Sequence, residues 1–252
     1  MNVLIFGGTT EGRELFEKLL ENHRVTLSVA EEYGKGVFQK NHDSIRVGRL
    51  DENQMQKLIL DCGAEAVFDA THPYAKNAHE KIKIACENAK IPLLRFCRKE
   101  SEEVDGVEKF DSLDELLEAV SKTRGNVFVA TGSKDISQIV EKIGAQRIFA
   151  RVIPSEKSIR SCLNAGVFPA RIIAMQGPFS ARLNEAIFLE TGAKILITKL
   201  SGKSGGEDEK ILAAKTCRMR IFALARPNLS NVPSVFSLNA ALLWLDSLKK
   251  KQ

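Results

Sequence analysis

The chain has 252 residues, of which 44% are hydrophobic and 27% are charged, and its formal net charge is +5. These values are typical of a globular protein, and the length is sufficient for one large domain or two small ones. No apolar run approaches the roughly 20 residues of a membrane span, and nothing resembles a signal peptide, so we expect a cytoplasmic protein without a membrane partner.

Composition also argues against metal and nucleic-acid sites. The five cysteines are odd in number and never occur as C-x-x-C, which disfavours a disulfide framework and a zinc site. With one Trp, two Tyr and no interleaving of basic and aromatic residues, the chain lacks the pattern of a nucleic-acid-binding protein. We therefore predict no metal site and no nucleic-acid partner, whereas the mild positive charge favours a small anionic substrate.

The first part of the chain alternates short apolar segments with amphipathic ones. We expect strands near residues 3–6, 25–29, 45–47, 66–69 and 92–95, and helices near 11–21, 53–61 and 75–88. This alternation is typical of a parallel sheet covered by helices. The polar, acidic segment 99–106 interrupts it, so we predict that residues 1–98 form a first domain.

The alternation then starts again. Strands are expected near residues 127–130, 147–150, 171–174, 194–198 and 220–224, with helices near 111–122, 134–143, 179–190 and 210–217. Residues 99–252 are thus predicted to form a second α/β domain. The sequence leaves open on which of the two halves its last helix, near 238–250, packs. The predicted fold class is α/β, with two Rossmann-like, doubly wound parallel-sheet domains and an interdomain cleft.

A glycine-rich bend follows the first strand, with the sequence Gly7-Gly8-Thr9-Thr10-Glu11-Gly12-Arg13. A bend of this kind places backbone N–H groups at the N-terminus of a helix, where a phosphate is attracted by them and by the helix dipole. The dinucleotide pattern G-x-G-x-x-G is imperfect, because Thr9 occupies the middle glycine position. Both a nucleotide site and a tight strand-to-helix turn explain the bend.

Polar clusters follow several of the other strands, at residues 71–74, 131–134, 151–155, 176–180 and 199–206. In open α/β sheets, ligands bind beyond the carboxyl ends of the strands, so these clusters are expected to line one cleft. The lysines and serines of 199–206 suit a phosphate or carboxylate, although a flexible linker has the same composition. Residues 71–74 either present His72 and Tyr74 to a ligand or only shape a turn. His23, His42 and His79 are assigned no role.

Taken together, these segments resemble the precorrin-6A reductase family of corrin-ring biosynthesis, including its cobalt-precorrin-6A members. The similar pieces occur in the family's order, at residues 7–13, 69–75, 131–134, 150–154, 176–180, 198–202 with Gly205, Gly206 and Lys210, and 226–227. The chain departs from the family at Leu200, where an acidic residue is common. It also lacks an Arg-Pro pair after the strand near 92–95, which leaves Arg95 and Arg98 as alternatives.

The resemblance implies that a reduced nicotinamide, NADPH or NADH, transfers a hydride to a ring double bond of precorrin-6A or cobalt-precorrin-6A and gives the 6B form. It implies cofactor contacts at Gly7, Gly8, Thr9, Thr10, Glu11, Arg13, Ser28, Ala30, Glu31 and Thr71. Tetrapyrrole contacts are expected at Tyr74, Ser133, Lys134, Arg151, Gln176, Ser180, Lys199, Ser201, Gly205 and Lys210. The candidates for the catalytic proton donor are Tyr74, His72 and Lys199.

Two questions stay open at the level of sequence. Glu31 lies 24 residues after Gly7, where an acidic residue binds the ribose of NADH, but Arg13 or Lys35 could bind the extra phosphate of NADPH. The alternative function is a non-catalytic, nucleotide-sensing regulatory protein. A short-chain dehydrogenase is disfavoured, because Ala78 stands where Tyr-x-x-x-Lys would require a lysine. No oligomeric state is predicted.

Overall fold

The structure is a computed structural model that describes residues 1–30, 42–97, 105–200, 206–226 and 232–249. The chain divides into two compact units. The first comprises Met1–Lys99 and Pro227–Gln252, and the second comprises Glu100–Arg226. We expected the second domain to extend over residues 99–252, so the observed second unit ends earlier than predicted.

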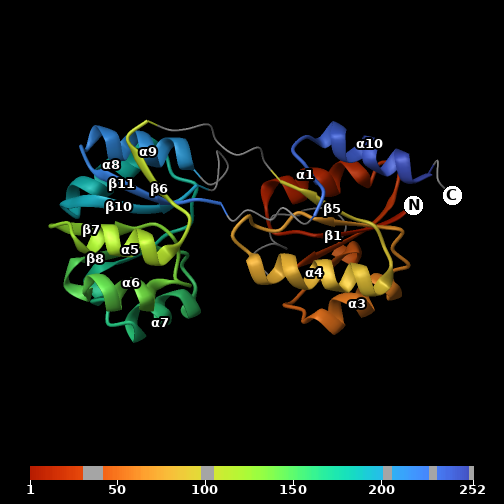
Figure 1. Ribbon diagram of the computed structural model, residues 1–252, viewed down its shortest axis with the longest axis horizontal. Helices are drawn as coiled ribbons and strands as arrows, with labels where there is room; N and C mark the ends of the chain where they lie inside the picture. Colours follow the sequence, from red (N-terminus) through yellow and green to blue (C-terminus); the bar gives the residue numbers. More distant parts are fainter. Residues whose placement is uncertain (31–41, 98–104, 201–205, 227–231, 250–252) are drawn as a thin grey trace. The chain divides into compact units, whose positions relative to one another are not determined.

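The first unit is built on a six-stranded parallel sheet with the order β12-β5-β4-β1-β2-β3 (Figure 1). Its elements in chain order are β1 (Asn2–Phe6), α1 (Thr10–Leu19), β2 (Arg24–Val29), the short 3-10 helix η1 (His42–Ser44), β3 (Ile45–Val47), α3 (Glu52–Asp61), β4 (Ala66–Asp69), α4 (Lys76–Ala89), β5 (Leu93–Phe96), β12 (Ser234–Val235) and α10 (Leu238–Lys249).

Alternate residues of β1 enter two different cores, because successive side chains of a strand point to opposite faces. Val3 and Ile5 pack with α1 and α10, whereas Leu4 and Phe6 pack with α3 and α4. Figure 1 shows α1 and α10 on one side of this sheet and α3 and α4 on the other. The helix that the sequence left unassigned, α10, thus belongs to the first unit, where Trp244 meets Phe68 edge-on at 5.1 Å.

The second unit repeats this architecture with the order β6-β11-β10-β7-β8-β9, again all parallel. Its elements are β6 (Val107–Phe110), α5 (Leu113–Ser121), β7 (Asn126–Val129), α6 (Ile136–Ile143), η2 (Ala145–Arg147), β8 (Ile148–Val152), α7 (Glu156–Asn164), η3 (Pro169–Arg171), β9 (Ile172–Ala174), α8 (Ala181–Glu190), β10 (Ala193–Lys199), α9 (Glu207–Thr216) and β11 (Arg220–Leu224).

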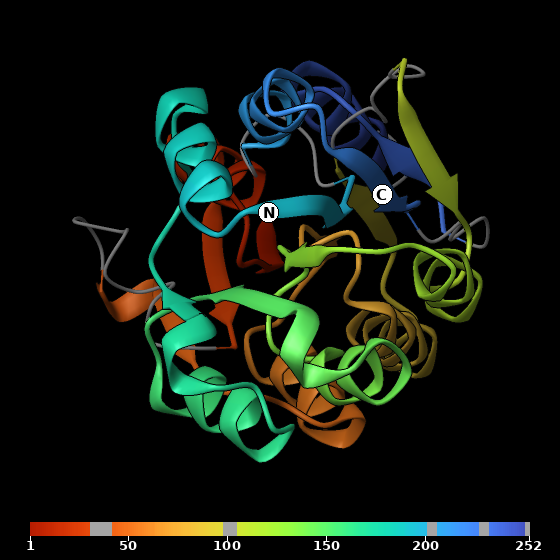
Figure 2. The ribbon, with the colours of Figure 1, turned by 90° about the vertical axis from the view of Figure 1, so that its left-hand side faces the viewer.

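Two apolar layers again enclose the sheet. Figure 2 shows α5 to α7 (yellow-green to green) on one face of the second sheet and α8 and α9 (cyan to blue) on the other. Val127 and Val129 of β7 contact the first set of helices, and Phe128 contacts the second set, where it meets Phe188 edge-on at 4.9 Å. The prediction of two doubly wound, parallel α/β domains is confirmed.

Each sheet has one point where the strand order reverses. In the first unit, β1 lies between β2 and β4, and in the second unit β7 lies between β8 and β10. At such switch points the connections leave in opposite directions, which opens a crevice beyond the carboxyl ends of the strands. The β1/β4 and β7/β10 pairs are therefore where each unit is expected to hold a ligand.

Candidate functional site

The glycine bend follows β1 at the switch point of the first unit. A side chain at Gly7 would place its Cβ 2.7 Å from Leu27 Cδ1, and one at Gly12 would lie 3.2 Å from Ala70 Cβ and 3.3 Å from Ala70 O. Gly8 differs from both, because its φ is +131° and a Cβ there would meet nothing within 4 Å. The bend thus packs closely against the sheet at Gly7 and Gly12. At Gly8 the backbone has free space beside it, which suits close approach of a ligand.

Thr9 is the N-cap of α1. Its Oγ1 accepts a hydrogen bond from Gly12 N at 3.1 Å and donates one to Ala70 O at 2.9 Å. The hydroxyl is therefore used within the fold, where it ties the bend to the end of β4. The geometry therefore disfavours the direct contact between this hydroxyl and a phosphate that the sequence suggested.

The other predicted cofactor residues lie around this bend. Thr10 and Glu11 open α1, and Arg13 follows in its first turn with Nε 4.0 Å from Glu17 Oε1. Ser28 is buried at the end of β2, where its carbonyl accepts a hydrogen bond from Gly7 N, and exposed Ala30 comes directly after that strand. Glu31 lies outside the described residues.

The segment 71–74 leaves β4 next to the bend. Tyr74 N donates to His72 Nδ1 at 3.3 Å, and the two rings lie 5.7 Å apart between centroids. His72 is exposed and Tyr74 is half-buried, whereas Thr71 donates both its N–H and its hydroxyl to Asp69 Oδ1. The structure thus brings His72 and Tyr74 together, and it uses the Thr71 side chain to hold the segment.

A buried ionic network under this segment was missed at the level of sequence. Asp69 of β4 contacts His79 Nδ1 of α4 through Oδ2, and Arg95 of β5 donates from NH2 to His79 Nε2 at 2.9 Å. Burial acts to raise the pKa of Asp69, but the hydrogen bonds from His79 and Thr71 outweigh it and lower that pKa. The signal that could have revealed the network is Asp69 itself, a carboxylate at the end of an otherwise apolar strand.

At the switch point of the second unit, Lys199 joins β10 to the loop after β7. Lys199 Nζ donates to Asp135 Oδ2 at 2.9 Å and to Thr131 O at 3.1 Å. Thr131 is buried, and its Oγ1 has no hydrogen-bond partner among the described residues. A buried hydroxyl without a partner is costly, so this strand end is suited to a polar ligand.

Two buried cations lie deeper in the second unit. Arg151 of β8 donates from NH1 to Asn184 Oδ1 at 2.7 Å, and its guanidinium lies 4.5 Å from the ring centroid of Phe179. Lys210 of α9 donates to Thr198 Oγ1 at 2.9 Å. Burial lowers the pKa of Arg151 to about 10, and burial together with the charge of Arg151 lowers the pKa of Lys210 to about 8. Both side chains are bonded to other residues of the protein, so we expect them to act as buried positive charges behind the exposed residues of the site.

The remaining predicted tetrapyrrole residues differ in accessibility. Lys134, Gln176 and Ser180 are exposed, and Ser180 caps α8 by accepting from Leu183 N. Ser133 is half-buried and donates to Ser158 Oγ at 3.2 Å. Ser201 and Gly205 lie outside the described residues.

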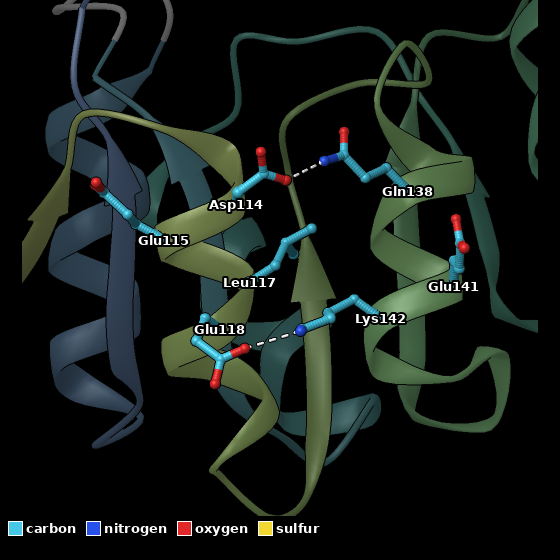
Figure 3. Close-up of a pocket in the computed structure, with 7 residues that line it drawn as sticks. All are labelled: Asp114, Glu115, Leu117, Glu118, Gln138, Glu141 and Lys142. Carbon is cyan, nitrogen blue, oxygen red and sulfur yellow. Dashed lines mark hydrogen bonds and ion pairs between the residues drawn. The ribbon is translucent and has the colours of Figure 1, made fainter.

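The hollow in Figure 3 is a different feature. It lies between α5 and α6 and is bridged by an ion pair of 2.8 Å between Lys142 and Glu118 and by a hydrogen bond from Gln138 to Asp114. No tetrapyrrole or cofactor residue predicted from the sequence lines it. Its exposed, mostly acidic lining does not suit the anionic substrate that the sequence favours, so we assign it no function.

Comparisons with known proteins agree with these features. The model of the family described as "Precorrin-6x reductase CbiJ/CobK" matches residues 2–246. A cobalt-precorrin-6A reductase of Methanothermobacter thermautotrophicus is 34% identical over 91% of this chain and 78% of its own length, and one of Salmonella typhimurium is 32% identical over 90% and 88%. The solved structure "CobK precorrin-6A reductase" has a TM-score of 0.79 at 21% identity and covers 98% of this chain and 97% of its own, which confirms the fold.

Two parallel α/β units, one with a glycine bend at its switch point, place the chain in the class of two-unit, Rossmann-like proteins. The chain belongs to the precorrin-6x reductase family. Enzymes of this family are oxidoreductases that act on a CH–CH group, and their general type of electron donor is a reduced nicotinamide. Among the helices of the described residues, none has the length and apolar character that a membrane crossing needs.

Proposed function

We propose that the chain reduces one ring double bond of cobalt-precorrin-6A with a reduced nicotinamide, giving the 6B form in corrin-ring biosynthesis. The observation that carries this proposal is the open glycine bend at the β1/β4 switch point of a chain that matches the family over residues 2–246. We choose the cobalt form because the relatives of 32% and 34% identity are both named for it, whereas a precorrin-6A reductase from Sinorhizobium is 26% identical.

The residues of the first unit fit the cofactor. The space at Gly8 and the N-terminus of α1 suit the pyrophosphate, and Thr9 and Gly12 keep the bend in contact with Ala70. When bound, the nicotinamide supplies the hydride that the ring carbon accepts. The bend, Thr10, Glu11 and Arg13 are proposed to hold the cofactor, and Ser28 and Ala30, at the end of β2, are proposed to lie toward its ribose. Glu31, which follows them in sequence, stays a predicted ribose contact.

The second unit is proposed to bind the carboxylates of the tetrapyrrole. Lys134 and Gln176 are exposed for direct contact, while Arg151 and Lys210 give the site a buried positive charge. Thr131 Oγ1 adds a polar group that has no partner within the described residues. Ser133, Ser180, Ser201 and Gly205 complete the set of proposed contacts. The interdomain cleft stays a prediction.

The proton that follows the hydride needs a donor, and Lys199 is the weakest of the three candidates. Its ammonium group is paired with Asp135, so loss of its proton would leave that half-buried carboxylate without its cation. Tyr74 and His72, which lie together after β4, are therefore favoured as the donor. Holding the reacting groups in line contributes more than the donor, because alignment of two reactants accounts for about 7–11 kcal/mol of a barrier.

The test is to incubate the purified chain with cobalt-precorrin-6A or precorrin-6A and with NADH or NADPH. We expect the near-ultraviolet absorbance of the reduced nicotinamide to fall, and the tetrapyrrole to gain two hydrogens by mass. Glu31 favours NADH over NADPH. Cofactor binding without turnover of either tetrapyrrole would contradict the proposal and favour the nucleotide-sensing alternative.

A further inference from the structure

Three ionisable side chains without an assigned role meet at the carboxyl edge of the first sheet. Asp69, His79 and Arg95 are 3%, 5% and 6% exposed. In the register of the sheet, Asp69 pairs with Phe6 of β1 and with Arg95 of β5, so the carboxylate and the guanidinium stand side by side. The first turn of α4 brings His79 against both.

The hydrogen bonds assign the state of this network. A guanidinium only donates, so His79 Nε2 accepts from Arg95 and Nδ1 carries the proton that is donated to Asp69. Each ring nitrogen of His79 thus bonds one of the two buried charged groups. Loss of either ring nitrogen leaves one buried charge without its partner.

The same groups hold the backbone of the segment after β4. Asp69 Oδ1 accepts from Thr71 N at 3.0 Å and from Thr71 Oγ1 at 2.7 Å. Ala70, between Asp69 and Thr71, accepts the hydrogen bond of Thr9 from the glycine bend. Asp69 of the network is thus adjacent in sequence to Ala70, which the bend contacts, and it precedes His72 by three residues.

We propose that Asp69, His79 and Arg95 are positioning residues of the reductase: they fix residues 70–74 and, through Ala70, the glycine bend, so that Tyr74 and the bound nicotinamide keep one relative placement. This inference rests on the proposed function. Stability alone is a poor explanation of the network, because buried ionic groups are often replaced by apolar residues of similar volume without loss of stability. Placement near the reacting groups is a better one, since a shift of about 1 Å reduces a rate up to about 100-fold.

The experiment compares His79→Asn and His79→Gln with Ile82→Val. Asn retains an amide near Nδ1, facing Asp69, and Gln retains one near Nε2, facing Arg95 and His72 O. Ile82 is fully buried on the same helix but packs in the apolar core between α3 and α4, so its variant controls for general loosening of α4. All three proteins are assayed for kcat, for KM of both substrates, and for the isotope effect with nicotinamide deuterated at C4.

We expect both His79 variants to lower kcat by about 10- to 100-fold, with KM changed less than about twofold and a larger isotope effect, because poor alignment slows the hydride step itself. Ile82→Val should leave all three quantities as in the unsubstituted chain. Equal kcat values in the His79 variants and Ile82→Val would overturn the proposal.

A second readout does not depend on turnover. Amide hydrogen exchange reports the bonds Thr71 N–H to Asp69 and Ala75 N–H to His72 O, the latter at 2.8 Å. Exchange at both amides should accelerate in the His79 variants and not in Ile82→Val; unchanged exchange overturns the proposal even if kcat falls. If the unsubstituted chain binds reduced nicotinamide but reduces neither tetrapyrrole, the proposed function fails, and the exchange result alone decides whether the network holds this segment.

Discussion

Lys199 and Asp135 form an ion pair of 2.9 Å that joins the end of β10 to the start of α6, and Lys199 also donates to Thr131 O. The two strands that end here, β10 and β7, are the switch-point pair of the second unit. The side chains are 16% and 23% exposed, so solvent screens the pair only in part. Lys199 therefore shapes the loop on which Thr131, Ser133 and Lys134 lie.

Replacement of Lys199 by methionine should weaken substrate binding and stability together. The variant leaves Asp135 and Thr131 O without their donor, which we expect to lower the free energy of unfolding by about 1–3 kcal/mol. KM for the tetrapyrrole should rise, because the loop after β7 loses its anchor. Urea unfolding and steady-state kinetics measure the two effects. Asp135→Asn, which retains an acceptor, should show both effects more weakly; an effect of Lys199→Met on kcat alone would instead indicate a proton donor.

Tyr74→Phe removes only the phenol oxygen. If Tyr74 supplies the proton, kcat should fall by at least about 100-fold while the melting temperature stays close to that of the unsubstituted chain, since the ring remains. His72→Asn is the companion variant, because it keeps a side-chain group for the Tyr74 N–H. If neither variant changes kcat, both residues are excluded as the donor.

Gly8 and Gly48 allow cofactor binding to be separated from backbone strain. Their φ angles are +131° and +138°, and a Cβ at either meets nothing within 4 Å. An alanine at either position should therefore cost similar stability, about 1–3 kcal/mol. Only Gly8→Ala lies on the bend, and we expect it to weaken the binding of reduced nicotinamide by about tenfold, measured by fluorescence titration. Equal loss of affinity in both variants would contradict a cofactor site at the bend.

The buried Lys210 should leave a signature in the pH dependence of stability. Burial, with the charge of Arg151, lowers its pKa from 10.5 to about 8 in the folded chain, so the unfolded chain binds more protons between these two values. The contribution of Lys210 to the free energy of unfolding must therefore rise as the pH increases from about 8 to 10.5. The difference in unfolding free energy between the unsubstituted chain and Lys210→Met should grow by about 3 kcal/mol over that interval. A difference that does not change with pH would show that Lys210 is not buried as a cation.

Local patterns predicted much of the fold, and the errors have physical reasons. The strand, bend and helix at residues 2–19 carry all their signals within one segment. By contrast, β6 was missed because Glu108 and Lys109 are exposed on an edge strand, and β12 was missed because it has only two residues. The place of α10 was left open, since an apolar helix face does not specify the sheet it covers.

The candidate site was predictable where its residues are neighbours in sequence and unpredictable where they are not. The bend and the His72–Tyr74 pair were found from adjacent residues. The network of Asp69, His79 and Arg95 comes from two strands and a helix, and Lys199 pairs with a residue 64 positions away. Such partners are determined by strand order and register, which no local pattern contains.

The most direct test of the central claim is a single turnover of cobalt-precorrin-6A with nicotinamide that carries deuterium at C4, followed by mass spectrometry of the tetrapyrrole. The account predicts a product that has gained one deuterium from the cofactor and one hydrogen from water, together with one equivalent of oxidised nicotinamide. A tetrapyrrole that gains no deuterium from either face of the labelled cofactor would contradict it.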